Sequence, residues 1–251
     1  MTVAPPPGFR ILALDEIDST NAEAARRAAA GEAEGLVIWA RSQSAGRGRR
    51  GRIWISPAGN CYSSILLRPR CKPRAALGLG FAAALAAADA VREALGSRGG
   101  AIALKWPNDV LLDGRKISGC LMESSVGANG DVDHLVVGVG INVASHPTDT
   151  EYPATSLAAA GAQAANIEAV LTGYVEAFAA WYERWRHEGF APIRAAWLGL
   201  ATGLGQTIKV RLEDEVLDGI FSTLDGHGAL VLKLADGERV IDTGEVFPVR
   251  S

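Results

Sequence analysis

The sequence predicts an α+β fold, in which a mixed β-sheet with flanking helices is followed by a small all-β domain. Two observations indicate this fold class. Strand-length apolar runs and long Ala-rich stretches alternate up to about residue 200, which is typical of strands combined with helices. After Gly203 and Gly205 the chain changes to short β-branched runs separated by Asp-Gly and His-Gly pairs, which predicts a small barrel or sandwich. We therefore expect one domain at residues 1–202 and a second at residues 203–251.

The first part of the chain is predicted to contain three strands, one helix and one loop. A Ser or Thr before an Ala-rich run is a capping signal, so a helix is expected to begin after Ser19 or Thr20 and to end at Gly31. The expected strands are residues 10–17, 36–40 and 62–67. Residues 41–52 lie between the last two strands and are polar and rich in Gly and Arg, which predicts a loop.

The rest of the chain is predicted to contain three helices and two groups of strands. The expected helices are residues 75–95, 167–187 and 192–198. The expected strands of the first domain are residues 102–106, 110–112, 116–124 and 134–139. Asp113-Gly114 is a hairpin signal within this group, and Asn129-Gly130 marks a second turn. The expected strands of the second domain are residues 206–212, 216–224, 229–234 and 239–242.

The composition restricts the class of protein. The 251 residues are 48% hydrophobic, which is enough for a substantial core, and the net charge of −3 gives no general positive field for nucleic acid. The three cysteines Cys61, Cys71 and Cys120 lack the paired short spacing of a metal or redox site, so we expect reduced thiols and a cytoplasmic protein. The N-terminus lacks a secretory signal pattern, and the apolar stretch 75–88 is too short to span a bilayer, so we expect no membrane association.

The most informative motif is the loop at residues 43–52, Gln-Ser-Ala-Gly-Arg-Gly-Arg-Arg-Gly-Arg, with Trp54 close behind it. Its glycines let the backbone approach a ligand, and its four arginines supply planar forks that bind phosphate and carboxylate. The loop therefore predicts a polyanionic ligand, although a solvated basic loop or an RGG-like nucleic-acid contact has the same composition. A dinucleotide-binding motif does not fit, because the GxGxxG pattern here precedes a strand, and the chain has no P-loop sequence.

A second polar motif follows the predicted strand 102–106. Lys105-Trp106-Pro107-Asn108-Asp109 puts a lysine, an amide and a carboxylate into one turn fixed by proline, and the following hairpin returns Lys116. Lys116 could stabilise charge that develops when a carboxylate attacks a phosphate, and the simpler alternative is a surface lysine. Asp109 could bind Mg²⁺ or position an incoming amine, or could only cap the turn. Asn142, after a glycine-rich strand, could contact the edge of a base.

Together these motifs resemble those of the biotin protein ligases over nearly the whole chain. The matching segments, in the same order and spacing, are Asp18 to Asn21, the Gly-Arg-Gly-Arg-Arg-Gly loop with Trp54, Lys105 to Asp109, Gly114 to Gly119 and Gly138 to Asn142. The resemblance implies a catalytic domain like those of class II aminoacyl-tRNA synthetases, with a small SH3-like β-barrel after it. It also implies ATP-dependent ligation of biotin to a lysine through biotinoyl-5′-AMP.

The resemblance further implies residue roles. The expected catalytic residues are Lys116, Arg49 and Asp109. The expected biotin-binding residues are Ser19, Thr20, Asn21, Gln43, Arg47, Gly48, Arg49, Lys116 and Gly119. The expected ATP- and adenylate-binding residues are Arg47, Arg49, Arg50, Arg52, Trp54, Asn108, Lys116 and Asn142. Asp109 is the candidate metal ligand, for Mg²⁺ that arrives with ATP. The arginines and Lys116 would neutralise the biotin carboxylate and the phosphates, which otherwise repel one another.

The expected partner is the biotin carboxyl carrier domain of acetyl-CoA carboxylase or a related carboxylase, and the enzyme is expected to be a monomer or a homodimer. Some family members carry an N-terminal helix-turn-helix. The motif at residues 18–21 leaves no room for one here, so we expect no DNA binding. Two rival functions remain open at this point: a lipoate ligase or octanoyl transferase, and a module that binds nucleic acid through the arginine loop.

Overall fold

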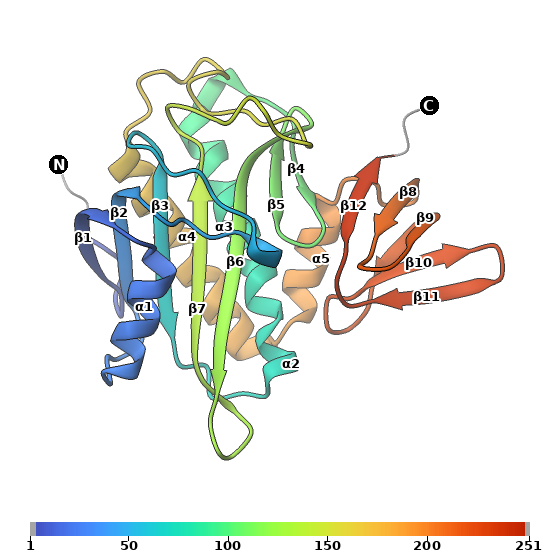
Figure 1. Cartoon of the computed structure of the whole chain (residues 1–251), viewed down its shortest axis with the longest axis horizontal. Coiled ribbons are helices and arrows are strands. Elements are labelled where there is room, and N and C mark those ends of the chain that lie inside the picture. The colour runs from blue at the N-terminus through green and yellow to red at the C-terminus, as the bar shows by residue number, and fades with distance from the viewer. Residues whose placement is uncertain (1–3, 249–251) are drawn as a thin grey trace.

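The computed structural model describes residues 4–248 and contains two β-sheets with helices packed around the larger one (Figure 1). The larger sheet has the strand order β1-β2-β3-β7-β6-β5-β4. Its strands are β1 Arg10–Ile17, β2 Leu36–Gln43, β3 Cys61–Leu67, β4 Ile102–Lys105, β5 Asp109–Leu112, β6 Arg115–Val126 and β7 Val132–Ile141. Only β1 and β2 pair in parallel, so the sheet is mixed, as predicted.

The helices cover both faces of this sheet, with α1 in front of it and α3 and α4 behind it in Figure 1. The α-helices are α1 Thr20–Ala29, α2 Pro73–Ala76, α3 Gly78–Leu95, α4 Ile167–Glu188 and α5 Ala191–Gly199. Two short 3₁₀ turns, η1 Arg49–Gly51 and η2 Gly96–Arg98, lie in the connections. The fold class predicted from the sequence is confirmed.

The second sheet is antiparallel and has the order β11-β10-β9-β8-β12, which agrees with the expected SH3-like fold. Its strands are β8 Thr207–Arg211, β9 Val216–Leu224, β10 Leu230–Leu234, β11 Gly237–Ile241 and β12 Glu245–Pro248. The sequence predicts four of these strands and misses β12, which is only four residues long and ends in a proline.

The larger sheet is buried on both faces because alternate side chains of its central strands point in opposite directions. One set packs against α1, and it includes Ile38, Leu66 and Val136. The other set packs into the main core, and it includes Val37, Ile65 and Val137. All seven residues of β3 are buried as a result.

The Ala-rich segment Pro73–Arg98 is long and apolar enough to cross a membrane, but 72% of its most apolar window is buried inside the protein. The uninterrupted apolar stretch at residues 75–88 is shorter than this segment, because α3 continues to Leu95. Small side chains on α3 let this helix pack against α4 and α5 and behind the sheet, so it is the central helix of the core.

Two local expectations need correction. Ser19 occupies the N-cap position of α1, so the helix begins where predicted, but its side chain makes no capping hydrogen bond. The backbone N–H of Thr20 in the first turn is instead accepted by Gln43 Oε1 at 2.8 Å. The helix expected at 75–95 is divided at Leu77 into α2 and α3. At the break, Gly78 packs so closely on Phe190 that an added Cβ would lie 2.8 Å from the ring.

The two sheets are joined through a buried contact at Gly228, in the turn between β9 and β10. Trp106 Nε1 donates to the Gly228 carbonyl at 3.0 Å, and a Cβ at this glycine would collide with the ring of Phe81. Gly228 also has a φ of 92°, which side chains other than glycine rarely adopt. The position of the small domain therefore depends on a residue without a side chain.

We expect Gly228→Ala to lower the free energy of unfolding by about 3 kcal/mol, because it combines backbone strain with a clash in the core. Gly226→Ala in the same turn is the matched control, since an added Cβ there has no atom within 4 Å, and it should change stability by less than about 0.5 kcal/mol. Urea denaturation measures both. Equal stability of the two variants would contradict this description of the contact.

Candidate functional site

The floor of the candidate site is a group of glycines on β6 and β7. Gly119 pairs with Gly140 across the two strands, and Gly138 lies two residues earlier on the same face as Gly140. An added Cβ at Gly140 would lie 2.5 Å from Trp54 Nε1, and one at Gly138 would collide with the amide of Asn21. The register of the strands is regular here, so these glycines serve close approach of other groups rather than a β-bulge.

The arginine loop folds over this floor as an irregular hairpin. Gln43 pairs with Ser56 and Arg47 pairs with Ile53 through isolated β-bridges, and the Trp54 N–H donates to the Gly46 carbonyl at 2.9 Å. The loop thereby places the Trp54 indole against Gly140, and the centre of its ring lies 5.3 Å from Lys116 Nζ. The indole N–H of Trp54 is buried without a hydrogen-bond partner among the described residues, so an acceptor on a ligand would stabilise it.

Neutral polar groups line the end of the site near the start of α1. Ser19, Thr20 and Asn21 are buried, and Gln43 reaches Thr20 from β2. Asn21 donates to Glu123 on β6, whose other carboxylate oxygen pairs with Arg47 at 3.1 Å. This end of the site can recognise an uncharged polar group through hydrogen bonds.

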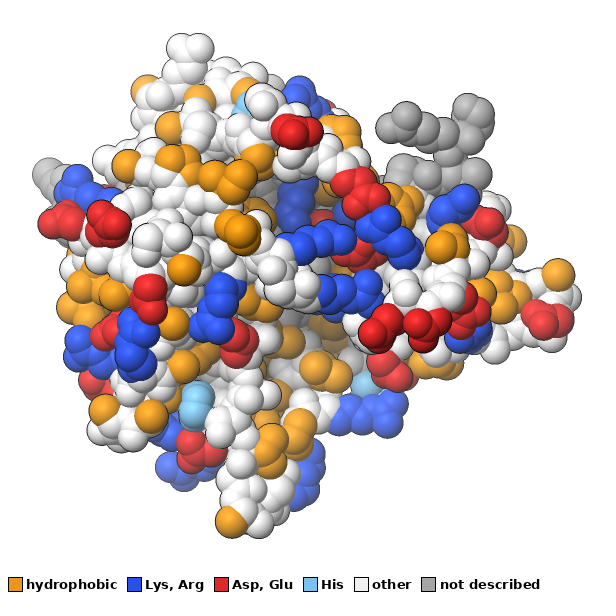
Figure 2. Space-filling view, viewed as in Figure 1, with side chains coloured by type: hydrophobic (Ala, Val, Ile, Leu, Met, Phe, Trp, Pro, Cys, Tyr) orange, Lys and Arg blue, Asp and Glu red, His pale blue; other side chains and the backbone are white. Residues whose placement is uncertain are grey.

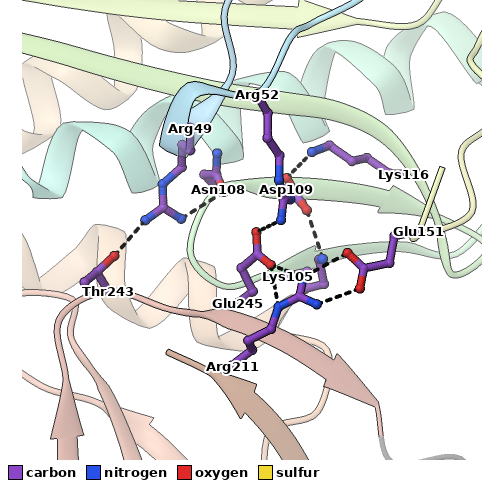
Figure 3. A network of polar contacts seen from close by, with 10 residues as sticks. All are labelled: Arg49, Arg52, Lys105, Asn108, Asp109, Lys116, Glu151, Arg211, Thr243 and Glu245. Atoms are coloured by element: carbon purple, nitrogen blue, oxygen red, sulfur yellow. Dashed lines mark hydrogen bonds and ion pairs between the residues drawn. The ribbon is translucent and has the colours of Figure 1, made fainter. Parts of the chain in front are cut away.

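The opposite end of the site contains two lysines that share one carboxylate. Asp109 at the start of β5 lies 2.6 Å from Lys116 Nζ and 3.0 Å from Lys105 Nζ, and each contact uses a different oxygen (Figure 3). Burial by itself raises the pKa of a carboxyl, but the charges of Lys116 and Lys105 outweigh it and lower the pKa of Asp109. The three groups together carry one excess positive charge, which a bound anion can neutralise.

Lys105 is a site residue that the sequence analysis quoted but gave no role. It is 8% exposed, and its Nζ lies 4.0 Å from the centre of the Tyr152 ring and 5.9 Å from that of Phe247. Such contacts between a cation and an aromatic face stabilise a buried charge. Tyr152 and Phe247 come from an irregular loop and from the unpredicted strand β12, so no sequence signal placed them beside Lys105.

A charged bridge connects the arginine loop to the small domain. Arg52 pairs with Glu245 on β12 at 2.5 Å, Glu245 also pairs with Arg211 on β8, and Arg211 pairs with Glu151 at 2.7 Å (Figure 3). Burial raises the pKa of a carboxyl, yet the hydrogen bonds from Arg211 and Arg52 prevail and lower the pKa of Glu245. Arg52 is therefore engaged by the protein itself.

Arg49 occupies the centre of the site between the two domains. It contacts Asn108 Oδ1 at 3.4 Å and Thr243 Oγ1 at 3.3 Å, and both contacts are long (Figure 3). Burial, together with the charge of Arg50, lowers the pKa of Arg49. This guanidinium lacks a carboxylate partner among the described residues, so it is suited to receive an anion.

The structure brings all of the sequence-predicted site residues to one cleft with a volume of about 360 Å³, within the range of small-ligand sites. Figure 2 shows Lys and Arg side chains gathered around this hollow between the larger body and the smaller lobe. The residues are Ser19, Thr20, Asn21, Gln43, Arg47, Gly48, Arg49, Arg50, Arg52, Trp54, Asn108, Asp109, Lys116, Gly119 and Asn142. The cleft also includes Lys105, Tyr152, Glu245 and Phe247, which the sequence analysis did not select.

Two predicted residues are engaged differently from expectation. Both oxygens of Asp109 are occupied by lysines, and residues 4–248 contain no group of three side chains suited to hold a metal ion, so the donor set does not fit a protein-bound metal. Asn142 donates one amide hydrogen to the Thr155 carbonyl at 2.9 Å, which leaves its side-chain oxygen and its second amide hydrogen for a ligand. The amide of Asn142 also supports the loop that carries Tyr152.

Comparison with known proteins gives consistent matches over both parts of the chain. Residues 14–142 match the biotin/lipoate A/B protein ligase family, and residues 203–247 match the biotin protein ligase C-terminal domain. The chain is 43% identical to a biotin-(acetyl-CoA-carboxylase) ligase of Paracoccus denitrificans, over 93% of this chain and 98% of that protein. It is 30% identical to the bifunctional ligase/repressor BirA of Bacillus subtilis, over 95% of this chain and 74% of that protein.

A solved structure shows the same fold. The biotin protein ligase from Aquifex aeolicus in complex with biotin and ATP superposes with a TM-score of 0.78 at 27% identity, and the match covers 96% of this chain and 99% of the other. The match extends over both sheets of the present structure.

We expect Glu245→Ala to free Arg52 and loosen the arginine loop, because the variant removes the only carboxylate that pairs with Arg52 among the described residues. Limited trypsin digestion should then cleave the loop several-fold faster. Asp218→Ala is the control, since it removes an exposed carboxylate of the same domain that pairs weakly with Lys209 at 3.9 Å. Cleavage of the loop at the same rate in both variants would show that Glu245 does not restrain it.

Proposed function

Since this chain belongs to the biotin/lipoate A/B protein ligase family and matches both domains of its biotin protein ligases, we propose that it attaches biotin to a lysine of an acceptor protein with ATP, through biotinoyl-5′-AMP. The observation that carries this function is one cleft with two different ends. A neutral polar end suits the ureido ring of biotin, and a cationic end suits a carboxylate and phosphates. The chain is a ligase of the biotin-(acetyl-CoA-carboxylase) type.

The first step joins two anions, so its main requirement is charge neutralisation. An oxygen of the biotin carboxylate attacks the α-phosphorus of ATP, a P–O bond to that phosphorus forms, and the bond to pyrophosphate breaks. We assign Lys116 and Arg49 to the charge that develops on the α-phosphate, with Arg47 and Arg50 nearby on the loop. Lys105 adds a buried positive charge behind Lys116 through their common partner Asp109.

The second step transfers the acyl group. The amine of the acceptor lysine attacks the carbonyl carbon of biotinoyl-AMP, a C–N bond forms, AMP leaves with the former carboxylate oxygen, and the amine loses a proton. Cys120 also lines the cleft, but burial raises the pKa of its thiol to about 12, so it stays protonated and is a poor nucleophile. These residues therefore support direct transfer of the biotinoyl group from AMP to the acceptor amine, without an intermediate on Cys120.

The loop protects the intermediate from water. Trp54 lies on the glycine floor beside Lys116, where its ring can cover a bound nucleotide. Arg52 and Glu245 attach the loop to the small domain, so closure involves both domains. Exclusion of water matters because a mixed anhydride hydrolyses readily.

Magnesium would enter with the phosphates of ATP rather than through a protein site, because both oxygens of Asp109 already pair with lysines. Asp109 instead holds the two lysines at a fixed separation. Bound Mg²⁺ would supply additional neutralisation of the phosphates.

We further propose a biotin carboxyl carrier domain as the acceptor, consistent with acetyl-CoA carboxylase being the substrate named for the Paracoccus relative. A cytoplasmic location and the division into residues 1–202 and 203–251 are part of the same proposal. The match of residues 203–247 to the C-terminal domain of biotin protein ligases supports this division.

The direct test is to incubate the purified protein with biotin, labelled ATP and Mg²⁺ without an acceptor. We expect biotinoyl-AMP and pyrophosphate to form, and lipoate or octanoate to give no acyl-AMP. Adenylation of lipoate instead of biotin would assign the chain to the other branch of the family. Absence of any acyl-AMP from folded protein would overturn the proposed function.

Lys116→Ala should lower the rate of pyrophosphate release by roughly 100-fold or more while changing the Kd of biotin much less, because the charge it neutralises grows in the transition state. Lys209→Ala on β8 is the control, since Lys209 is exposed and lies outside the cleft. A Lys116 variant with a normal rate would remove this residue from the catalytic set.

A further inference from the structure

A chain of hydrogen bonds runs beside the neutral end of the cleft, from β6 to the arginine loop. In order, it joins Glu123, Asn21, Ser64, Thr20 and Gln43. Thr20 and Asn21 are each 4% exposed, and Ser64 is completely buried. Because solvent barely reaches these groups, their few hydrogens must be shared among their protein neighbours.

The direction of the chain is fixed at its Glu123 end. A carboxylate only accepts, so Asn21 must turn Nδ2 toward Glu123 Oε2, at 2.7 Å. The amide oxygen of Asn21 then faces Ser64 Oγ at 2.5 Å, and the Ser64 hydroxyl must donate its single hydrogen to that oxygen. Ser64 Oγ is left with lone pairs alone for Thr20 Oγ1, at 2.8 Å.

The direction is also fixed at the loop end, by a backbone carbonyl. Ser56 Oγ donates to the Trp54 carbonyl at 2.8 Å, so it accepts from Gln43 Nε2 at 2.9 Å. Gln43 therefore turns Oε1 toward Thr20. That oxygen accepts the Thr20 backbone N–H at 2.8 Å and lies 3.1 Å from the Thr20 hydroxyl.

Both ends converge on Thr20, which lines the cleft. Its hydroxyl hydrogen faces two acceptors within the protein, Ser64 Oγ and Gln43 Oε1, so the oxygen offers lone pairs to a ligand. Gln43 uses one hydrogen of its amide on Ser56 and keeps the second. The subsite therefore combines an acceptor with a neighbouring donor, as a cyclic urea requires.

We propose that Glu123 is a positioning residue that makes Thr20 a hydrogen-bond acceptor and thereby selects a ligand with an N–H group at this subsite. The inference rests on the proposed function, in which that N–H belongs to the ureido ring of biotin. A lipoyl or octanoyl chain has no N–H group and would leave the acceptor unsatisfied. Glu123 does not line the cleft, so it acts through Asn21 and Ser64.

The two oxygens of Glu123 have separate partners, and this makes Glu123→Gln a sharp test. Oε2 accepts from Asn21, and Oε1 pairs with Arg47 at 3.1 Å. A glutamine has one oxygen, which the guanidinium takes because a charged donor bonds more strongly. The glutamine NH₂ then faces Asn21 and reverses its amide. Ser64 would next donate to Thr20, so the Thr20 hydrogen would lose Ser64 as an acceptor. Its remaining protein acceptor would be Gln43 Oε1, at 3.1 Å and already bonded to the Thr20 N–H, and the hydrogen could turn to the cleft instead.

The experiment compares biotin with its two carbamate isomers, in each of which one ureido N–H is replaced by oxygen at nearly the same size. Isothermal titration calorimetry without ATP gives the Kd ratios. We expect wild-type protein to reject at least one isomer by about 100-fold, because an oxygen would face the Thr20 lone pairs. In Glu123→Gln this ratio should fall about tenfold or more.

Arg47→Ala is the matched control, because it removes the other partner of Glu123 and leaves the bond to Asn21 intact. It should weaken biotin and the isomers by similar factors and keep the ratio. An unchanged ratio in Glu123→Gln, or an equal fall in Arg47→Ala, would overturn the inference. Failure of wild-type protein to bind biotin would instead overturn the proposed function.

A neutron structure of the wild-type protein tests the same inference without a ligand or a variant. We expect the Ser64 hydrogen to lie on the line to Asn21 Oδ1, and the Thr20 hydrogen to point toward Ser64 or Gln43. A Thr20 hydrogen directed into the cleft, or an Asn21 amide in the opposite orientation, would refute the assigned polarity.

Discussion

The buried pairing of Asp109 with Lys105 and Lys116 is the interaction on which the cationic end of the cleft depends. A lysine that is 8% exposed is stable only with a counterion, and removal of one member of a buried charge pair typically costs about 3–5 kcal/mol. The pairing follows directly from the sheet, because Lys105 and Asp109 are registered partners on β4 and β5, and Asp109 is registered with Gly119 on β6. This register places Lys105 beside Asp109, and Lys116 reaches the same carboxylate from the hairpin end of β6.

The arginine loop and the small domain complete this cleft from outside the sheet. Glu245 and Thr243 contact Arg52 and Arg49, and Glu151 contacts the small domain through Arg211. Protein carboxylates thus hold part of the loop, while Arg49 and the lysine pair retain excess positive charge. Arg52 is therefore paired within the protein, whereas Arg49 has no carboxylate partner among the described residues and can bind an anion.

The sequence alone predicts the fold class, most of the elements and the local motifs of the site. Apolar periodicity locates α3, α4 and the central strands, and Asp113-Gly114 forms the expected turn with positive φ at both residues. It does not predict β12 or the break at Leu77, because both depend on tertiary contacts rather than on local pattern. Glu123, Tyr152 and Glu245 were missed for the same reason, since each acts through a residue that is distant in the sequence. The loop arginines and Lys116 could be selected from the sequence, because these residue types by themselves indicate binding of an anion.

The central claim is that the α-phosphate of the adenylate lies between the arginine loop and the lysine pair. The most direct measurement is a crystal structure with a non-hydrolysable analogue of biotinoyl-AMP. We expect phosphate oxygens within hydrogen-bonding distance of Lys116 Nζ and the Arg49 guanidinium, with Asp109 still between the two lysines. A phosphate bound away from both Arg49 and Lys116, or a displaced Asp109 that coordinates a metal ion, would contradict it.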